Sequence, residues 1–218
     1  MGHTLSAVNS SDTNELLERA AKGDQEAWGT LLNRYRERLH TMVALRLDRR
    51  LQGRLDASDV VQEALLEASL HLADYARDPR LPFYLWLRAV TGQRMVALYR
   101  HHLGVQARDA GREVSLYQGS FPQASSTALA AKLLGHEARP SEEIQKAEQC
   151  LLLQEALNRM DPVDREVLAL RHFEQLSNGE IAQVLNLRES AASKRYVRAL
   201  QKLKEIITDL PGGKEMCL

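Results

Sequence analysis

Residues 176–203 constrain the fold most strongly, because they combine a helix start, a turn and a second helix in one short stretch. Ser177 stands three residues before Glu180, which is the spacing of a capping box. In such a box each side chain accepts a hydrogen bond from the backbone N–H of the other residue. Asn186 interrupts the apolar run that follows, where a turn is needed. The stretch therefore predicts two helices joined by a tight turn.

The second of these helices, expected from about Glu189 to Lys204, is basic on one side. Its apolar stripe at helical spacing consists of Tyr196, Ala199, Leu200 and Leu203, and its cations off that stripe are Lys194, Arg195, Arg198 and Lys202. A helix held by one face can lie in the DNA major groove, where cations contact phosphates and some reach base edges. An ordinary helical hairpin with a solvated basic face is the alternative. The capping box, the turn and the basic helix together favour DNA binding.

Composition narrows the classes of protein that fit the chain. With 44% hydrophobic residues, only 5% aromatic residues, 12 Gly and 6 Pro in 218 residues, it favours an all-α fold. The formal net charge is zero, so contact with nucleic acid must come from local basic patches. Cys150 and Cys217 form neither a metal-ligand pattern nor a disulfide framework. We expect no metal and no cofactor, and a cytoplasmic protein without a membrane span or secretion signal.

Residues 56–72 predict a helix with two different faces. Asp56 or Ser58 can cap its start, and early carboxylates suit the positive end of a helix. The apolar face is formed by Val61, Ala64, Leu65, Ala68 and Leu72, and the polar face by Asp59, Gln62, Glu63 and Glu67. By periodicity alone the polar face is more often simply solvated than a docking surface for a basic partner.

Residues 83–103 predict a helix that mixes aromatic side chains with cations, which suits single-stranded DNA. Trp86 taken alone is better explained as a core residue, whereas Arg88, Arg94 and Arg100 fit a functional and a solvated face equally. Residues 104–140 carry repeated Gly and Pro and are expected to form a mostly disordered linker, with a short helix near residues 129–134.

Two motifs in the first half of the chain are similar to those of bacterial RNA polymerase sigma factors of the extracytoplasmic-function (ECF) type. Residues 56–66 (DASDVVQEALL) resemble the polymerase-binding helix of that family. Residues 86–90 (WLRAV), followed by Tyr99 and Arg100, resemble the segment that melts and reads the minus-ten promoter element.

A third motif resembles the promoter-reading C-terminal domain of the same family. It comprises residues 157–160 (LNRM), 165–173 (REVLALRHF), 176–182 (LSNGEIA) and 198–203 (RALQKL). The resemblance implies two helical domains joined by a flexible linker, the C-terminal one containing a helix-turn-helix. Their expected boundaries are 12–103 for a region 2-like domain, 104–140 for the linker and 141–208 for a region 4-like domain.

The resemblance also implies binding roles for particular residues. Binding to core polymerase is implied for Asp59, Val60, Gln62 and Glu63. Binding to minus-ten DNA is implied for Trp86, Arg88, Gln93, Arg94, Tyr99 and Arg100, and to minus-thirty-five DNA for Ser193, Lys194, Arg195 and Arg198. The implied partners are core RNA polymerase and promoter DNA, both duplex and melted. An anti-sigma protein, phosphorylation or the linker could restrain such a factor.

Departures from the family pattern leave the promoter sequence open. Gln93 stands where the family often has Asn, and Ala97 where it often has Asp. On the recognition helix, Ala191 and Ala192 replace the usual Thr and Val, and Arg188 occupies the expected cap position.

Two other classes of protein were weighed against the sigma-factor interpretation. A stand-alone helix-turn-helix regulator would use residues 12–103 for signalling or dimerisation. An enzyme is disfavoured, because the chain has no nucleophile elbow, no phosphate loop and no metal-spaced His and Cys cluster.

Overall fold

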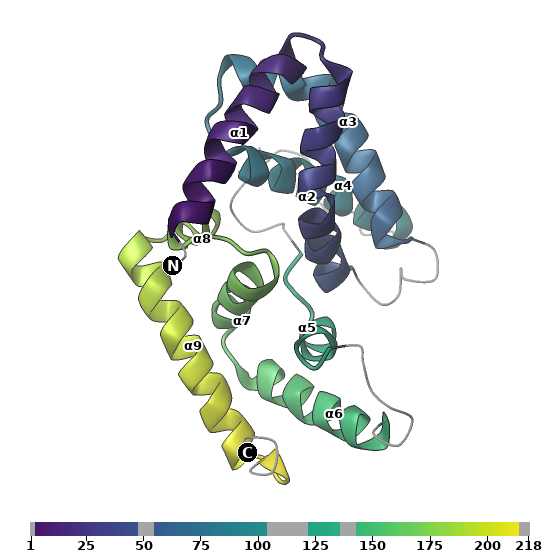
Figure 1. Ribbon diagram of the computed structural model, residues 1–218. Helices are drawn as coiled ribbons and strands as arrows, with labels where there is room; N and C mark the ends of the chain where they lie inside the picture. The colour runs from purple at the N-terminus through teal and green to yellow at the C-terminus, as the bar shows by residue number, and fades with distance from the viewer. Residues whose placement is uncertain (1–2, 48–54, 104–121, 136–142, 214–218) are drawn as a thin grey trace. The chain divides into compact units, whose positions relative to one another are not determined.

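The computed structural model describes residues 3–47, 55–103, 122–135 and 143–213 (Figure 1). All regular structure within these ranges is helical, as the sequence predicted. The helices are α1 (His3–Ala21), α2 (Gln25–Arg46), α3 (Ala57–Arg77), α4 (Phe83–Leu103), α5 (Ser126–Leu133), α6 (Glu143–Arg159), α7 (Pro162–Leu168), the π-helical turn η2 (Ala169–Phe173), α8 (Asn178–Leu185) and α9 (Glu189–Asp209). None of the described helices is long and apolar enough to cross a lipid bilayer.

The chain divides into two compact units. The first comprises residues 1–43 and 55–105, and the second comprises residues 44–54 and 106–218. The predicted helix-turn-helix therefore belongs to the second unit, and the helix with an acidic face belongs to the first.

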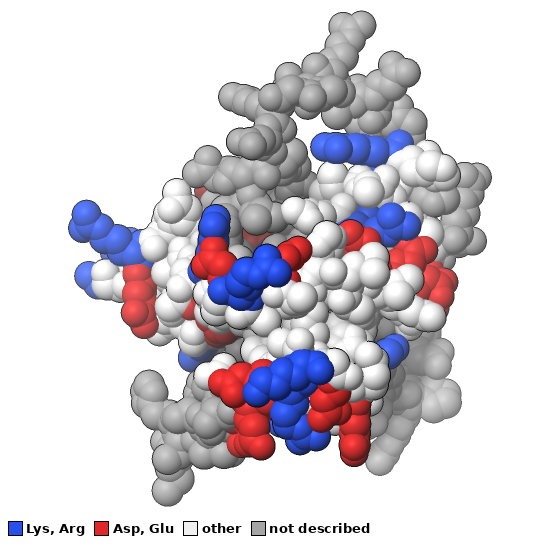
Figure 2. Space-filling model, turned by 90° about the horizontal axis from the view of Figure 1, so that it is seen from above, with Lys and Arg blue, Asp and Glu red and all other residues white. Residues whose placement is uncertain are grey.

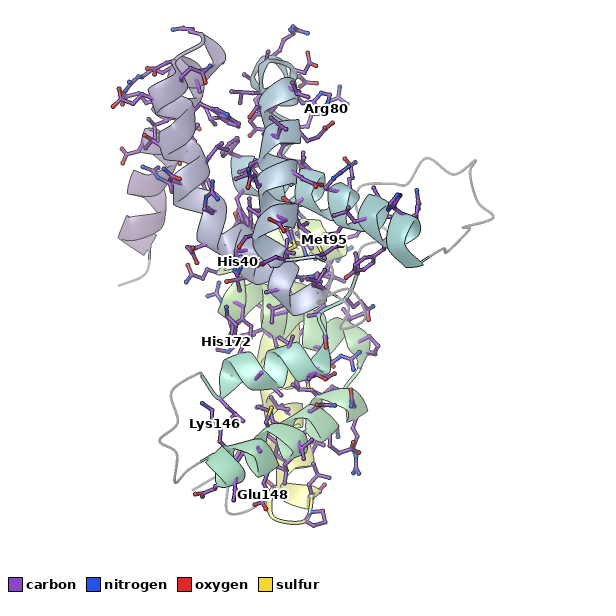
Figure 3. All side chains as sticks on the ribbon, turned by 90° about the vertical axis from the view of Figure 1, so that its right-hand side faces the viewer. His40, Arg80, Met95, Lys146, Glu148 and His172 are labelled. Carbon is purple, nitrogen blue, oxygen red and sulfur yellow. The ribbon has the colours of Figure 1, made fainter. Side chains whose placement is uncertain are left out.

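Aromatic side chains from three helices form much of the core of the first unit. Trp28 and Tyr35 of α2, Tyr75 of α3, and Phe83, Tyr84 and Trp86 of α4 have ring centroids 4.5–6.3 Å apart in successive pairs. The indole N–H of Trp28 donates to Ser69 Oγ of α3 at 2.8 Å, so its polar atom is satisfied inside the packing. Met95 of α4 is also buried, whereas Arg80 extends outward from the turn between α3 and α4 (Figure 3).

Polar side chains fix where the helices of the first unit begin. Asp24 accepts hydrogen bonds from the backbone N–H groups of Glu26 and Ala27, both at 3.0 Å, at the start of α2. Asp56 accepts from Ser58 N at 2.9 Å and caps α3, as expected from the sequence. These caps satisfy backbone donors that have no partner within the helix.

Local signals also fix where the helices of the second unit begin and end. Asp161 caps α7, and Pro162 occupies its first turn, where the missing N–H is no loss. The capping box of α8 is complete, with Glu180 N donating to Ser177 Oγ at 3.2 Å and Ser177 N to Glu180 Oε2 at 2.8 Å. Asn186 ends α8 in the left-handed conformation, at φ 53°, and makes the tight turn into α9.

Helix α9 spans the second unit and is packed by α6, α7 and α8 (Figure 1). It runs to Asp209, five residues beyond the predicted end at Lys204, because Ile206 and Ile207 extend its buried stripe. The core beneath it also contains Leu157, Leu168 and Ala169.

Helix α5 lies within the segment that the sequence indicated as a linker. Leu129 and Ala130 are buried in the core of the second unit, and Ser125 caps the helix. Residues 104–121 and 136–140 of the predicted linker lie outside the described residues. The second unit also contains a buried ion-pair group in which Arg46 binds Glu166 and Glu174, the latter at 2.6 Å.

Candidate functional site

The acidic face of α3 is exposed, as the two-faced sequence pattern predicted. Asp59, Gln62 and Glu63 all lie on the solvent side of the helix, one turn apart. Val60, included with them by resemblance, is only 1% exposed and packs in the core of the first unit. Val60 therefore supports the helix from within and has no surface to offer a partner.

Two leucines continue this face in a way that the sequence interpretation missed. Leu66 is 66% exposed and Leu70 is 71% exposed, although both are large apolar residues on an otherwise polar face. They follow Asp59 and Glu63 at helical spacing, so the four side chains form one stripe along α3. We call Asp59, Glu63, Leu66 and Leu70 the α3 stripe. The helical spacing of Leu66 and Leu70 with Asp59 and Glu63 was the only feature of the sequence that indicated this stripe.

The second half of α4 exposes a polar and basic face. Gln93, Arg94, Ala97 and Arg100 are all exposed, and Tyr99 is half-buried. The guanidinium of Arg94 lies 2.6 Å from Glu63 Oε2, so the predicted minus-ten helix and the α3 stripe meet at an ion pair. Both side chains are more than 40% exposed, so this pair is solvent-screened.

In the predicted minus-ten set, Arg88 is buried in the first unit and Trp86 is half-buried. Arg88 is 7% exposed. The Trp86 ring stacks on Tyr75 at a centroid distance of 4.5 Å, and Phe83 lies 5.6 Å away, so packing neighbours occupy much of the indole. Burial, with the nearby Tyr35 contributing less, raises the pKa of Tyr75 to about 12. Within the predicted minus-ten set, the side chains that are exposed, and so accessible to DNA, are those of Gln93, Arg94 and Arg100.

The recognition helix α9 has a buried side and an open side. Ala192, Ala199 and Leu203 are buried, and Ser193 is half-buried at the edge. Lys194 and Arg198, one turn apart, are exposed on the open side. Leu200, which the sequence pattern placed on the apolar stripe, is 39% exposed.

Arg195 differs from the other cations of the predicted recognition set. Its Nε lies 2.6 Å from Asp164 Oδ1, and its terminal nitrogen lies 3.3 Å from Asp161 Oδ1. Both carboxylates belong to the start of α7, more than thirty positions earlier in the chain. A sequence pattern confined to one helix gives no signal for such a pairing.

Charge on the surface is mixed. On the face shown in Figure 2, basic and acidic side chains lie beside one another in small groups, in keeping with the zero net charge of the chain. Among the described residues there is no group of three or more His, Cys, Asp or Glu side chains arranged to hold a metal ion.

Comparison with known proteins agrees with these features. Residues 150–203, which include α8 and most of α9, match the family model described as Sigma-70, region 4. The chain is 29% identical over 203 residues to the RNA polymerase sigma factor CnrH of Cupriavidus metallidurans, covering 92% of this chain and 97% of that protein. It is 22% identical over 195 residues to the ECF RNA polymerase sigma factor SigW of Bacillus subtilis, covering 89% and 96% of the two chains.

A solved structure shares the fold. The structure of CnrH in complex with the cytosolic domain of CnrY matches with a TM-score of 0.54 and 24% identity, covering 91% of this chain and 99% of that one. The two-unit helical fold, the region 4 match and the relatives along nearly the whole chain define a sigma factor. Within that class, the chain is a sigma factor of the ECF type.

Proposed function

We propose that this protein is a transcription initiation factor that binds core RNA polymerase and directs it to specific promoters. The observation that carries the proposal is the separation of two surfaces. An exposed acidic and apolar stripe lies on α3 in the first unit, and an exposed basic face lies on α9 in the second. The proposed role is non-enzymatic, because both surfaces serve to bind other molecules.

In this proposal the α3 stripe docks on core polymerase. Asp59, Gln62 and Glu63 supply negative charge that attracts a basic partner and orients it. Leu66 and Leu70 supply apolar area that is exposed in the free protein and becomes buried in the complex. Charge then selects the partner, and apolar burial contributes most of the affinity.

The exposed face of α4 is proposed to bind the opened minus-ten element. Arg94 and Arg100 can track the phosphates of a single strand, while Gln93 has amide groups that can hydrogen-bond to base edges. Tyr99 is half-buried and can offer an aromatic surface for stacking. Arg88, which is buried, and Trp86, which is half-buried and stacked on Tyr75, support this helix through packing.

Helix α9 is proposed to enter the major groove of the minus-thirty-five element. Lys194 and Arg198 are exposed one turn apart, so they can contact phosphates or guanine edges, and Ser193 lies beside them. The capping box and the Asn186 turn fix the angle at which α8 presents this helix.

A cytoplasmic location follows from the proposed role, since core polymerase and promoter DNA are found there. The CnrH structure named above contains the cytosolic domain of CnrY, so we further propose that this chain is also restrained by a dedicated anti-sigma protein.

The proposal is tested with the full chain and purified bacterial core polymerase. Run-off transcription from a library of randomised promoters should yield transcripts only when the chain is present, and the chain should co-elute with core polymerase. The double substitution Asp59→Lys with Glu63→Lys should abolish co-elution, because it reverses two exposed charges of the α3 stripe. The double substitution Glu15→Lys with Glu18→Lys, on the exposed side of α1, makes the same charge change elsewhere and should have little effect.

A stand-alone regulator would behave differently in the same experiments. It would bind a specific duplex tightly in a gel shift without polymerase and would give no transcripts with it. That pair of results, or unchanged co-elution of the charge-reversed α3 variant, would refute the proposed function.

A further inference from the structure

Arg195 lies at the edge of the packed side of α9 and is half-buried, whereas the other two cations expected to bind duplex DNA are exposed. Residues three, four and seven positions apart share one side of a helix. Arg195 is therefore aligned with the buried residues Ala192 and Ala199. Arg198, three positions after Arg195, and Lys194 lie further from the buried stripe, and both are exposed.

The partners of Arg195 join the recognition helix to the start of α7. Its side chain is 35% exposed, and that of Asp164 is 21% exposed, so their 2.6 Å contact is partly shielded from water. Asp161, at 3.3 Å, also caps α7 by accepting hydrogen bonds from Val163 N and Asp164 N. One guanidinium thus holds two carboxylates that are themselves fixed at a helix start.

From this geometry we propose that Arg195 is a positioning residue, which sets the orientation of α9 against α7 and does not itself contact promoter DNA. The inference rests on the proposed function, because it concerns how α9 is presented to duplex DNA. Of the three cations expected to contact duplex DNA, the inference leaves only Lys194 and Arg198 in direct contact with it. Asp164 becomes a determinant of promoter affinity although its charge would repel DNA.

The two possible roles of Arg195 predict opposite effects of one substitution, Asp164→Asn. If Arg195 contacts DNA, removing the carboxylate frees the guanidinium and removes a repulsive charge, so promoter affinity rises. If Arg195 positions α9, the same change loosens the helix and affinity falls. We expect a loss of roughly five- to tenfold, between the effects typical of exposed and of buried ion pairs.

The experiment uses the full chain bound to core polymerase and a labelled duplex enriched from a random library by the wild-type complex. Asp164→Asn and Arg195→Ala should both weaken binding while leaving its salt dependence unchanged. Arg198→Ala should lower the slope of log affinity against log salt by about 0.9 if it contacts one phosphate. Asp209→Asn, at the exposed end of α9, is the matched control that removes one negative charge and should not weaken binding.

A charge-swapped pair guards against simple misfolding. Arg195→Asp and Asp164→Arg should each weaken binding, and the double variant should recover affinity to within about twofold of wild type. Tighter binding by Asp164→Asn, a flattened salt dependence in Arg195→Ala, or no recovery in the double variant would each overturn the proposal. If the wild-type complex enriches no duplex, the proposed function fails instead. A double-mutant cycle on thermal unfolding then decides whether Arg195 and Asp164 are coupled.

Discussion

The α3 stripe makes a quantitative prediction about polymerase binding through its two exposed leucines. Leu66→Ala with Leu70→Ala removes apolar surface from the stripe while keeping its carboxylates. Alanine is an excellent helix former, and both positions are exposed, so the first unit should fold as well as the wild type.

The expected loss follows from how much of each side chain is free to be buried. Leucine to alanine removes roughly three methylene equivalents, at about 0.8 kcal/mol each when fully buried. Leu66 is 66% exposed and Leu70 is 71% exposed in the free chain, so docking can bury roughly two thirds of that surface. This corresponds to about 1.6 kcal/mol for each residue, about 3 kcal/mol for the pair, and roughly a hundredfold in Kd.

Fluorescence anisotropy with labelled chain and a titration of core polymerase measures this Kd directly. Leu133→Ala is the matched control, because Leu133 is an exposed leucine of α5 in the second unit. Thermal unfolding of each variant checks that the fold is retained. A double variant that binds core polymerase within about threefold of wild type would show that docking does not bury the α3 stripe.

Other predictions concern stability. Ser177→Ala should lower the free energy of unfolding by about 1 kcal/mol, measured by chemical denaturation, because it removes half of the capping box of α8. Since burial raises the pKa of Tyr75 to about 12 from an ordinary value of 10, the folded state holds that proton more tightly. Stability should therefore decline as pH rises from about 10 towards 12, and Tyr75→Phe should lack this component of the pH profile. Arg94→Gln should change the free energy of unfolding by less than about 1 kcal/mol and even less in 1 M salt, because its pair with Glu63 is exposed; a larger, salt-independent change would contradict that interpretation.

Local chemistry explains what could be predicted from the sequence. The caps at Asp56 and Ser177 depend on neighbours within a few residues, so their spacing was sufficient to locate two helix starts. The two faces of α3 followed from periodicity in the same way. The all-α fold, expected from composition, and the ECF class, expected from short motifs with fixed spacing, were both confirmed.

Long-range packing explains what could not be predicted. The partners of Arg195 are 31 and 34 positions away, and the neighbours that bury Arg88 cannot be identified from its own helix. Nothing in the sequence signalled the π-helical turn η2 at the end of α7, and we have no physical account of it. The resemblance grouped Val60 with the exposed Asp59, although the polar face indicated by periodicity did not include Val60.

The turn at Asn186 has a consequence for how such a protein can diverge. Three residues, 186–188, join α8 to α9. Asn186 is left-handed and Leu187 N donates back to Ala182 O at 2.8 Å, so the connection has no slack. Substitutions at Lys194 or Arg198 change the exposed surface of α9 without changing its orientation. Sequence preference can therefore evolve one side chain at a time. An insertion at the turn would instead change the direction in which α9 leaves α8 and displace every outward side chain together.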